Sequence, residues 1–146
     1  MPREKVMVDI GVRVILRDGN RVFLSQRKQG ALAGRYDLPY GHLKPKENLI
    51  EGLLREAREE FGIHLQEEDL NFMGVVHHIR GAQSIDFIFE CTNWDGVVEN
   101  LEPDNCGAIG WFDIDHLPEH ILHQAEEVLE TYVHQRGFLI ELEDIS

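Results

Sequence analysis

The chain has 146 residues, of which 42% are hydrophobic and 28% charged, an ordinary balance for a folded globular protein. It contains no run of eighteen apolar residues, which excludes a membrane-spanning helix, and its length fits one domain covering residues 1–146. The net charge of −13 makes nucleic acid an unlikely partner, because a polyanion repels an acidic protein.

The compartment is indicated by the first residues and by the cysteines. Residues 1–19 alternate apolar and charged side chains and lack the apolar core of a signal peptide. The two cysteines, Cys91 and Cys106, form no CxxC pair and no metal-binding cluster, which favours a reducing environment. These features predict a cytoplasmic protein with no membrane partner.

The first half of the chain predicts a hairpin followed by a loop. Apolar residues alternate from Val6 to Leu16, which predicts a half-buried strand. Asp18-Gly19-Asn20 is a turn signal, and residues 22–26 form the second strand of the hairpin. A loop at residues 29–34 leads to a short segment that runs from Leu38 to Gly41.

A helix is predicted from Leu49 to Phe61. Asn48 has the character of an N-cap, and Glu51 is placed to complete a capping box. Gly62 stands where a helix usually ends on a glycine. At about 100° per residue, one face of this helix is apolar and therefore buried. The residues of that face are Leu49, Ile50, Leu53, Leu54, Ala57 and Phe61.

The remaining residues predict three strands, a second helix and a short apolar tail. The strands are expected at 72–79, 84–91 and 109–112, the helix at 119–135 and the tail at 138–140. The resulting order of strands and helices predicts an α/β protein with a mixed sheet and helices on its faces.

Charge is distributed unevenly along the chain. Residues 1–58 carry twelve Lys or Arg and seven Asp or Glu, whereas residues 59–146 carry two and twenty. Five basic residues fall close together before and around the first helix. They are Arg27, Lys28, Arg35, Lys44 and Lys46. Either they form a solvated basic loop, or they bind an anion beside the carboxylates of the helix.

Three carboxylates of the first helix, Glu56, Glu59 and Glu60, fall on one edge beside its buried face. Like charges spaced three and four residues apart destabilise a helix, so a purely structural helix would disperse them. A bound hard cation makes the clustering of carboxylates favourable, because Mg²⁺ prefers oxygen ligands. The alternatives are therefore a solvated acidic face or a metal site, with Arg55 placed to orient Glu59.

The spacing of this segment is also a motif. From Gly41 the chain reads five residues, Glu47, seven residues and then REAREEFGI, residues 55–63. This resembles the Nudix box, GX5EX7REUXEEXGU with U apolar, at every fixed position. The flanking segments are similar to MutT-like Nudix enzymes that cleave nucleoside triphosphates. These segments are Leu38-Pro39, residues 100–106, Gly110-Trp111-Phe112 and Leu117-Pro118.

The resemblance implies a Nudix-type α/β/α sandwich, with a mixed curved sheet between helices. It implies Mg²⁺ or Mn²⁺ held by Glu56, Glu59 and Glu60, together with the backbone carbonyl of Tyr40 or Gly41. It leaves the general base open between Glu56, Glu59 and an acid of a later loop. The candidates in that loop are Glu99, Glu102 and Asp104, of which Glu102 is preferred. Arg55 is expected to hold a glutamate, and Glu47 to shape the loop.

The implied substrate is a nucleoside triphosphate, including modified ones, cleaved to a nucleoside monophosphate and pyrophosphate. The residues expected to contact it are Arg27, Arg35, Lys44 or Lys46, and Trp111, whose alternative is a place in the core. Dinucleoside polyphosphates, nucleotide sugars and RNA 5′ ends are alternative substrates, and a non-catalytic nucleotide-binding regulator is a further alternative. Many family members are homodimers, which makes a dimer an expectation here.

Three residues depart from the pattern of the family. Tyr40 replaces the usual first glycine, Lys44 the usual glutamate and Lys46 the usual glycine of the loop. All three precede the helix, so the departures affect the shape of the loop and the choice of substrate rather than the glutamates of the motif.

Overall fold

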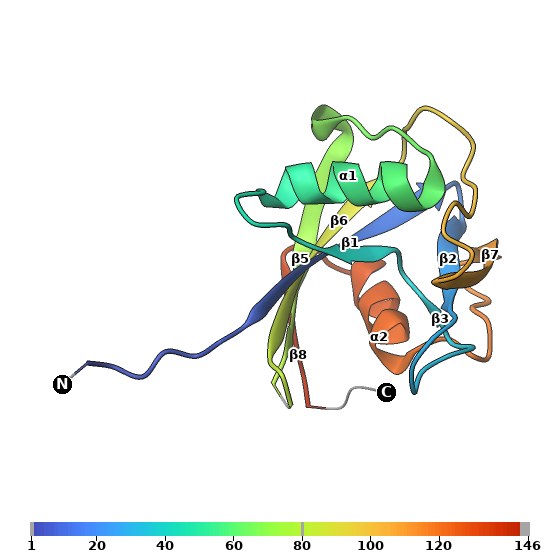
Figure 1. Ribbon diagram of the computed structural model, residues 1–146. Helices are drawn as coiled ribbons and strands as arrows, with labels where there is room; N and C mark the ends of the chain where they lie inside the picture. The colour runs from blue at the N-terminus through green and yellow to red at the C-terminus, as the bar shows by residue number, and fades with distance from the viewer. Residues whose placement is uncertain (1, 80, 144–146) are drawn as a thin grey trace.

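Strands β1 and β6 run side by side through the middle of the molecule, with a helix on either side of the sheet (Figure 1). The structure is a computed structural model that describes residues 2–79 and 81–143. The strands are β1 (Asp9–Asp18), β2 (Arg21–Arg27), β3 (Tyr36–Asp37), β4 (Tyr40–His42), β5 (Leu70–His78), β6 (Ser84–Cys91), β7 (Cys106–Asp113) and β8 (Phe138–Leu142). The helices are α1 (Leu49–Phe61), α2 (His123–Tyr132) and a short 3-10 turn, η1 (Glu67–Asp69).

The sheet is mixed, as the sequence predicted. Its strand order is β3-β2-β1-β6-β5-β8, while β4 pairs with β1 and β7 with β2. β1 runs parallel to β6, and β5 parallel to β8, whereas the other pairs are antiparallel. The expected α/β architecture with helices on both faces of a mixed sheet is confirmed.

The first strand differs from its prediction in burial. Residues 11–16 are all buried, so the prediction of a half-buried strand is wrong for this segment. β1 lies in the interior of the sheet, and its side chains enter hydrophobic clusters on both faces. The strand also starts at Asp9 instead of Val6, where its pairing with Ser84 of β6 begins.

Helix α1 forms over the predicted residues. Asn48 is the N-cap, its side chain accepts a hydrogen bond from the backbone N–H of Glu51, and the reciprocal bond completes the capping box. Gly62 ends the helix with φ 69°, a left-handed conformation that glycine adopts without a steric cost. Apolar residues of α1 pack against β1 and β6 in one hydrophobic cluster.

Helix α2 is shorter than predicted, spanning His123–Tyr132 instead of 119–135. The residues before it are held by backbone bonds to β3: Tyr36 donates its N–H to His120 and accepts one from Leu122. This extended segment cannot be helical at the same time. The apolar face of α2 packs against the other side of the sheet, with Leu122, Ala125, Val128 and Leu129 buried there.

Other boundaries move by a few residues. β7 begins at Cys106 instead of Ile109, because it pairs with the full length of β2. β8 extends to Leu142 beside β5, so the predicted apolar tail is an edge strand of the sheet. Within the described residues, neither α1 nor α2 has the length and apolar character needed to cross a membrane.

Candidate active site

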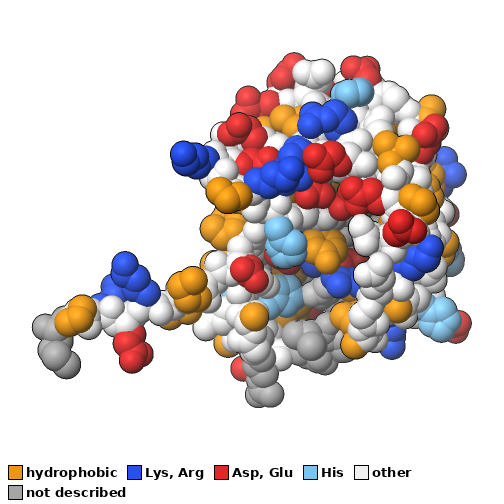
Figure 2. Space-filling view, viewed as in Figure 1, with side chains coloured by type: hydrophobic (Ala, Val, Ile, Leu, Met, Phe, Trp, Pro, Cys, Tyr) orange, Lys and Arg blue, Asp and Glu red, His pale blue; other side chains and the backbone are white. Residues whose placement is uncertain are grey.

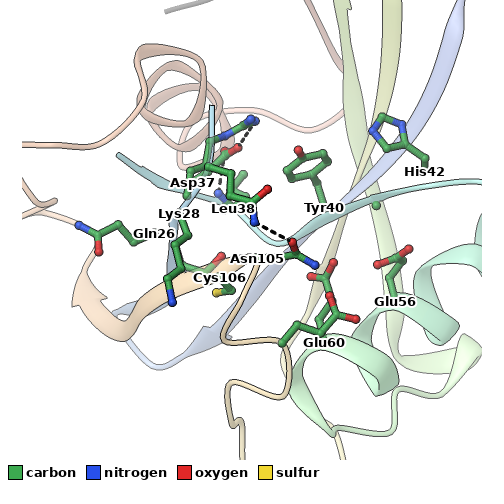
Figure 3. A pocket seen from close by; sticks show the side chains of 15 residues that line it. Gln26, Lys28, Asp37, Leu38, Tyr40, His42, Glu56, Glu60, Asn105 and Cys106 are labelled. Carbon is green, nitrogen blue, oxygen red and sulfur yellow. Dashed lines mark hydrogen bonds and ion pairs between the residues drawn. The ribbon is translucent and has the colours of Figure 1, made fainter. Parts of the chain in front are cut away.

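A cavity of about 370 Å³ opens between α1, β2, β4 and the loop that precedes β7 (Figure 3). Tyr40 and Asp37 lie at one end of it, and Glu56 and Glu60 at the other. The residues that line it are Ser25, Gln26, Arg27, Lys28, Gln29, Asp37, Leu38, Tyr40, Gly41, His42, Glu56, Glu60, Glu102, Asn105 and Cys106. Segments far apart in the sequence therefore meet here.

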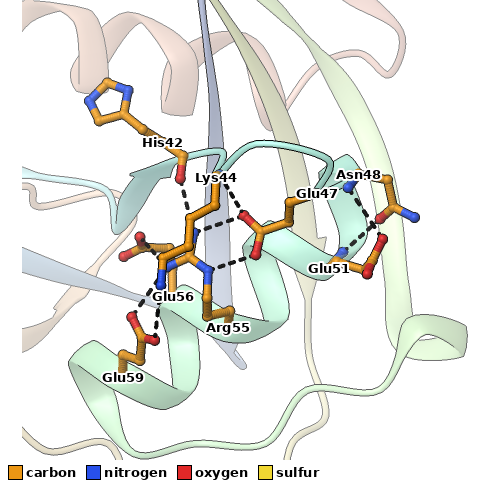
Figure 4. A network of polar contacts seen from close by, with 8 residues as sticks. All are labelled: His42, Lys44, Glu47, Asn48, Glu51, Arg55, Glu56 and Glu59. Carbon is orange, nitrogen blue, oxygen red and sulfur yellow. Dashed lines mark hydrogen bonds and ion pairs between the residues drawn. The ribbon is translucent and has the colours of Figure 1, made fainter.

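Arg55 connects the motif residues to one another (Figure 4). It donates from NH1 to Glu56 Oε1 at 2.8 Å and to Glu59 Oε2 at 3.2 Å. Its NH2 also donates to the backbone carbonyl of His42 at 3.0 Å, which ties α1 to the end of β4. One guanidinium thus fixes two carboxylates of the helix and the strand that faces them.

Glu47 is the main anchor of Arg55. Its two carboxylate oxygens accept from Arg55 Nε at 2.7 Å and from NH2 at 2.9 Å, a bidentate pair. It also accepts the backbone N–H of Lys44 at 2.9 Å. The hydrogen bond from Arg55, reinforced by the one from Lys44, lowers the pKa of Glu47 to about 2. Glu47 is therefore placed to hold the loop and Arg55.

Glu60 has the opposite environment. Its carboxyl group is largely enclosed and lies beside Glu56, with Glu102 and Glu59 nearby. Burial, a hydrogen bond with Glu56 and the negative charge of these neighbours raise the pKa of Glu60 well above its ordinary value. Glu60 has no cationic partner among the described residues, and a half-buried carboxylate beside others suits a divalent cation with oxygen ligands.

The donor set fits such an ion, although its members are not gathered around one point. Among residues 2–79 and 81–143, no three His, Cys, Asp or Glu side chains are grouped as a metal site. Glu59 is 42% exposed and pairs with Arg55 and, at 3.9 Å, with Lys44. Glu56 and Glu60 line the cavity, whereas Glu59 lies outside its lining.

The loop between β6 and β7 brings one further acid into the cavity. The backbone N–H of Leu101 donates to the carbonyl of Glu60, and that of Glu99 to Phe61, so the loop follows the end of α1. Glu102 lines the cavity as a result, whereas Glu99 and Asp104 do not. Of the three acids predicted for this loop, the structure places Glu102 beside Glu60.

The predicted basic residues separate into two groups. Arg27 lines the cavity, as does Lys28, which the sequence placed only in the basic segment. Arg35 is exposed outside it, and Lys44 and Lys46 lie on the exposed loop before α1. Acidic and basic side chains accordingly interleave over the region of α1 (Figure 2).

Trp111 lies in the hydrophobic cluster beneath α1, away from the cavity lining. Its ring stacks on Trp94 with the centroids 5.8 Å apart, and it meets Phe23 edge-on at 5.6 Å. Trp111 is half-buried among these rings and does not line the cavity, and its contact with the base stays a prediction.

A buried polar network behind the cavity was not anticipated. Arg13, only 5% exposed, donates to Asp37 at 2.8 Å and to Asp86 at 2.9 Å, and His78 lies 3.4 Å from Asp86. Arg27 donates to the second oxygen of Asp37 at 3.0 Å. A signal for it existed in the sequence: an arginine within an apolar strand requires a buried partner.

The chain is similar to proteins of known class. The model of the NUDIX domain family matches residues 7–132. The crystal structure of a MutT NUDIX hydrolase from Burkholderia pseudomallei superposes with a TM-score of 0.77, at 30% identity over 84% of this chain and 95% of that one. The solution structure of the E. coli ORF135 protein, at 20% identity and a TM-score of 0.73, shares the fold.

The curated relatives are longer proteins, of which only a part matches this chain. Human 8-oxo-dGDP phosphatase NUDT18 is 28% identical over 120 residues, which cover 77% of this chain and 36% of that protein. Human m7GpppN-mRNA hydrolase NUDT17 is 36% identical over 69 residues, which cover 45% of this chain and 21% of that protein. The chain thus spans about a third or less of the length of these relatives.

Proposed function

Because the chain belongs to the Nudix family, we propose that it is a hydrolase that cleaves the phosphoric anhydride bond of a nucleotide. The observation that carries this proposal is one cavity that is lined by Glu56, Glu60 and Glu102 and also by Lys28 and Arg27. Carboxylates at one end suit a divalent cation and the phosphates bound to it, and cations nearby suit the anionic substrate. The intact motif supports catalysis over a purely regulatory role.

In this proposal the metal is Mg²⁺ or Mn²⁺. Glu56, Glu59 and Glu60 would hold it together with a backbone carbonyl at Tyr40 or Gly41. When bound, such an ion neutralises the charge of the phosphates and lowers the pKa of a bound water. Arg55 acts as a positioning residue, since its hydrogen bonds to Glu56 and Glu59 set the directions of both side chains.

The general base is assigned to Glu102. It lines the cavity, and its loop is bonded to the end of α1. A base in this position can accept a proton from the attacking water, and the glutamates of α1 then remain free to bind the metal. Glu56 and Glu59 remain the alternatives, and Glu102→Gln separates them: a loss of kcat with retained metal binding supports Glu102.

The proposed substrate is a nucleoside triphosphate, cleaved to a nucleoside monophosphate and pyrophosphate. A second candidate is an oxidised nucleoside diphosphate, because a human relative that matches 77% of this chain is named as an 8-oxo-dGDP phosphatase. The capped 5′ end of an mRNA is less favoured, because the similarity to the m7GpppN-mRNA hydrolase covers only 45% of the chain and the net charge is −13.

A screen of nucleotides tests this proposal directly. The protein is incubated with Mg²⁺ and ordinary and 8-oxo nucleoside di- and triphosphates, dinucleoside polyphosphates, nucleotide sugars and capped RNA, and released phosphate and pyrophosphate are measured. Glu59→Gln serves as the catalytic control and should lose metal-dependent release while staying folded. The proposal is contradicted if Glu59→Gln is as active as the parent protein, or if the parent protein turns over none of these compounds.

A further inference from the structure

Tyr40 stands in β4, just before the Nudix box, where similar enzymes usually have a glycine, and its neighbours explain how a large ring is accommodated. β4 pairs with β1 so that Tyr40 lies directly opposite Arg13. The guanidinium carbon of Arg13 lies 4.7 Å from the centre of the Tyr40 ring, and that of Arg27 lies 5.0 Å from it. Two cations therefore contact one aromatic ring, within the range of cation–π attraction.

Asp37 holds both arginines in this arrangement. Its Oδ1 accepts from Arg13 NH1 at 2.8 Å and its Oδ2 from Arg27 NH2 at 3.0 Å. Asp37 is 2% exposed, so its own position is fixed by the surrounding protein. Arg13 has a second carboxylate partner, Asp86, and is buried out of reach of a ligand.

Arg27 is placed differently from Arg13. Its side chain is 26% exposed, and it lines the cavity. Asp37 is its one carboxylate partner among the described residues, and its buried Nε has no hydrogen-bond partner there. Hydrogen bonds alone therefore leave the guanidinium incompletely fixed, and the contact with the Tyr40 ring supplies the remaining restraint.

The two arginines at this end of the cavity are paired with carboxylates. Two guanidiniums, Arg13 and Arg27, face two carboxylates, Asp37 and Asp86. The opposite end, with Glu56, Glu60 and Glu102, is strongly acidic and suits a metal cation that binds the phosphates of the nucleotide. A phosphate gains little from an arginine that is already neutralised, whereas the flat face of a guanidinium remains available for stacking on a planar ring.

We propose that Tyr40 fixes the guanidinium of Arg27 as the wall against which the nucleobase of the substrate stacks. Tyr40 is then a positioning residue that determines specificity for a ligand with an aromatic base. The inference rests on the proposed function for the identity of the ligand, a nucleotide. It assigns Arg27 to the base rather than to the phosphates.

Two ligands that differ only in the base test this assignment. GMP and ribose 5-phosphate share the sugar and the phosphate, and GMP is a product-like ligand that needs no turnover. Their dissociation constants are measured with Mg²⁺ by NMR titration, for the parent protein, Tyr40→Phe and Tyr40→Leu. Tyr132→Leu is the matched control, because Arg17 lies over the Tyr132 ring at 5.5 Å in the same kind of contact outside this cavity.

Tyr40→Leu is expected to weaken the binding of GMP about tenfold and to change the dissociation constant of ribose 5-phosphate less than twofold. Tyr40→Phe keeps the ring and should bind GMP as the parent does, which separates the ring from the hydroxyl. Tyr132→Leu should leave both affinities unchanged. Thermal melting shows that each variant is folded at the temperature of the titration.

Several results overturn the inference. Equal weakening of both ligands in Tyr40→Leu assigns Arg27 to the phosphate, and no weakening of either removes Tyr40 from the site. A parent protein that binds GMP no better than ribose 5-phosphate also contradicts it. If the parent hydrolyses no nucleotide but binds GMP in a Tyr40-dependent way, the proposed function fails while this inference stands.

Discussion

Gly41 and Glu56 lie in such close contact that a Cβ atom at position 41 would be 2.2 Å from the Cγ atom of Glu56. No side chain other than that of glycine fits there unless Glu56 moves. The glycine that opens the motif is therefore required by the position of a glutamate fifteen residues later. It keeps β4 and α1 close enough for both to line one cavity.

Gly41→Ala is expected to displace Glu56 and to reduce metal-dependent nucleotide hydrolysis at least tenfold. Overpacking of this kind also costs about 1–3 kcal/mol of unfolding free energy. Steady-state kinetics and urea denaturation measure the two effects. Gly137→Ala is the control: its Cβ meets nothing within 4 Å, although φ is +69°, so it should lower stability and leave kcat unchanged. Equal kcat values for Gly41→Ala and the parent would contradict the requirement.

Arg55 and Glu47 should act as one unit in a double-mutant cycle. Glu47 positions Arg55 through two hydrogen bonds, and Arg55 in turn orients Glu56 and Glu59. Arg55→Ala is expected to lower kcat/KM at least tenfold and Glu47→Gln severalfold. Because they share one interaction, the double variant should be about as impaired as Arg55→Ala alone. Effects that simply multiply would show that the two residues act independently.

Glu60→Gln should have opposite effects on the metal-free and metal-loaded protein. Without a cation, burial of the Glu60 carboxyl group, its hydrogen bond with Glu56 and the charges of Glu56, Glu102 and Glu59 disfavour its ionised form, so a neutral amide avoids this cost and raises Tm. With Mg²⁺ added, the parent gains stability by binding the ion and the variant gains less. Thermal melting with EDTA and with a Mg²⁺ series checks both. A variant that melts below the parent in EDTA would refute the proposed cost of ionising Glu60.

The buried network behind the cavity predicts a loss of stability in acid. Burial raises the pKa of Asp86, but the hydrogen bond from His78 and the charge and hydrogen bond of Arg13 outweigh it and lower the pKa to about 2. A lowered pKa gives stability that is present above the ordinary value, about 4, and is lost as pH falls toward 2. The contribution of this one group is about 2 kcal/mol.

Urea denaturation of the parent and Asp86→Asn from pH 7 to pH 2 measures this contribution. The variant is expected to be less stable at pH 7, because Arg13 keeps only Asp37 as a carboxylate partner. The difference between the two proteins should shrink by about 2 kcal/mol as the pH falls. A difference that is constant across this range would show that the titration of Asp86 does not contribute.

The sequence predicted helix α1 to the residue, because its limits depend on local chemistry. Asn48, Glu51 and Gly62 form the capping bonds within a few residues of the helix ends. Helix α2 has no side-chain N-cap hydrogen bond, and its start is set by backbone bonds to Tyr36, about ninety residues earlier. A boundary set by such a distant contact leaves no local pattern to be read.

The same distinction applies to the cavity. Glu56 and Glu60 were found because a helical repeat places them on one edge. Asp37 was not singled out, and Tyr40 was singled out only as a departure from the family and as a candidate carbonyl ligand. Their contacts with Arg13 and Arg27 could not be foreseen, because these arginines reach them from β1 and β2. Trp111 was expected at the base on resemblance alone, and only the packing of the sheet shows that its ring contacts Trp94 and Phe23.

The loop that carries Glu102 is attached at more than one point. Lys28 and Gln29, at the end of β2, donate hydrogen bonds to the carbonyls of Pro103 and Asp104. The loop cannot swing outward as a hinged lid without breaking these bonds or pulling β2 with it. Thermal opening of this side of the cavity would therefore be a concerted event, and the backbone amides of Asn105 and Cys106, which donate to the Glu102 carbonyl, should exchange with deuterium slowly and at similar rates.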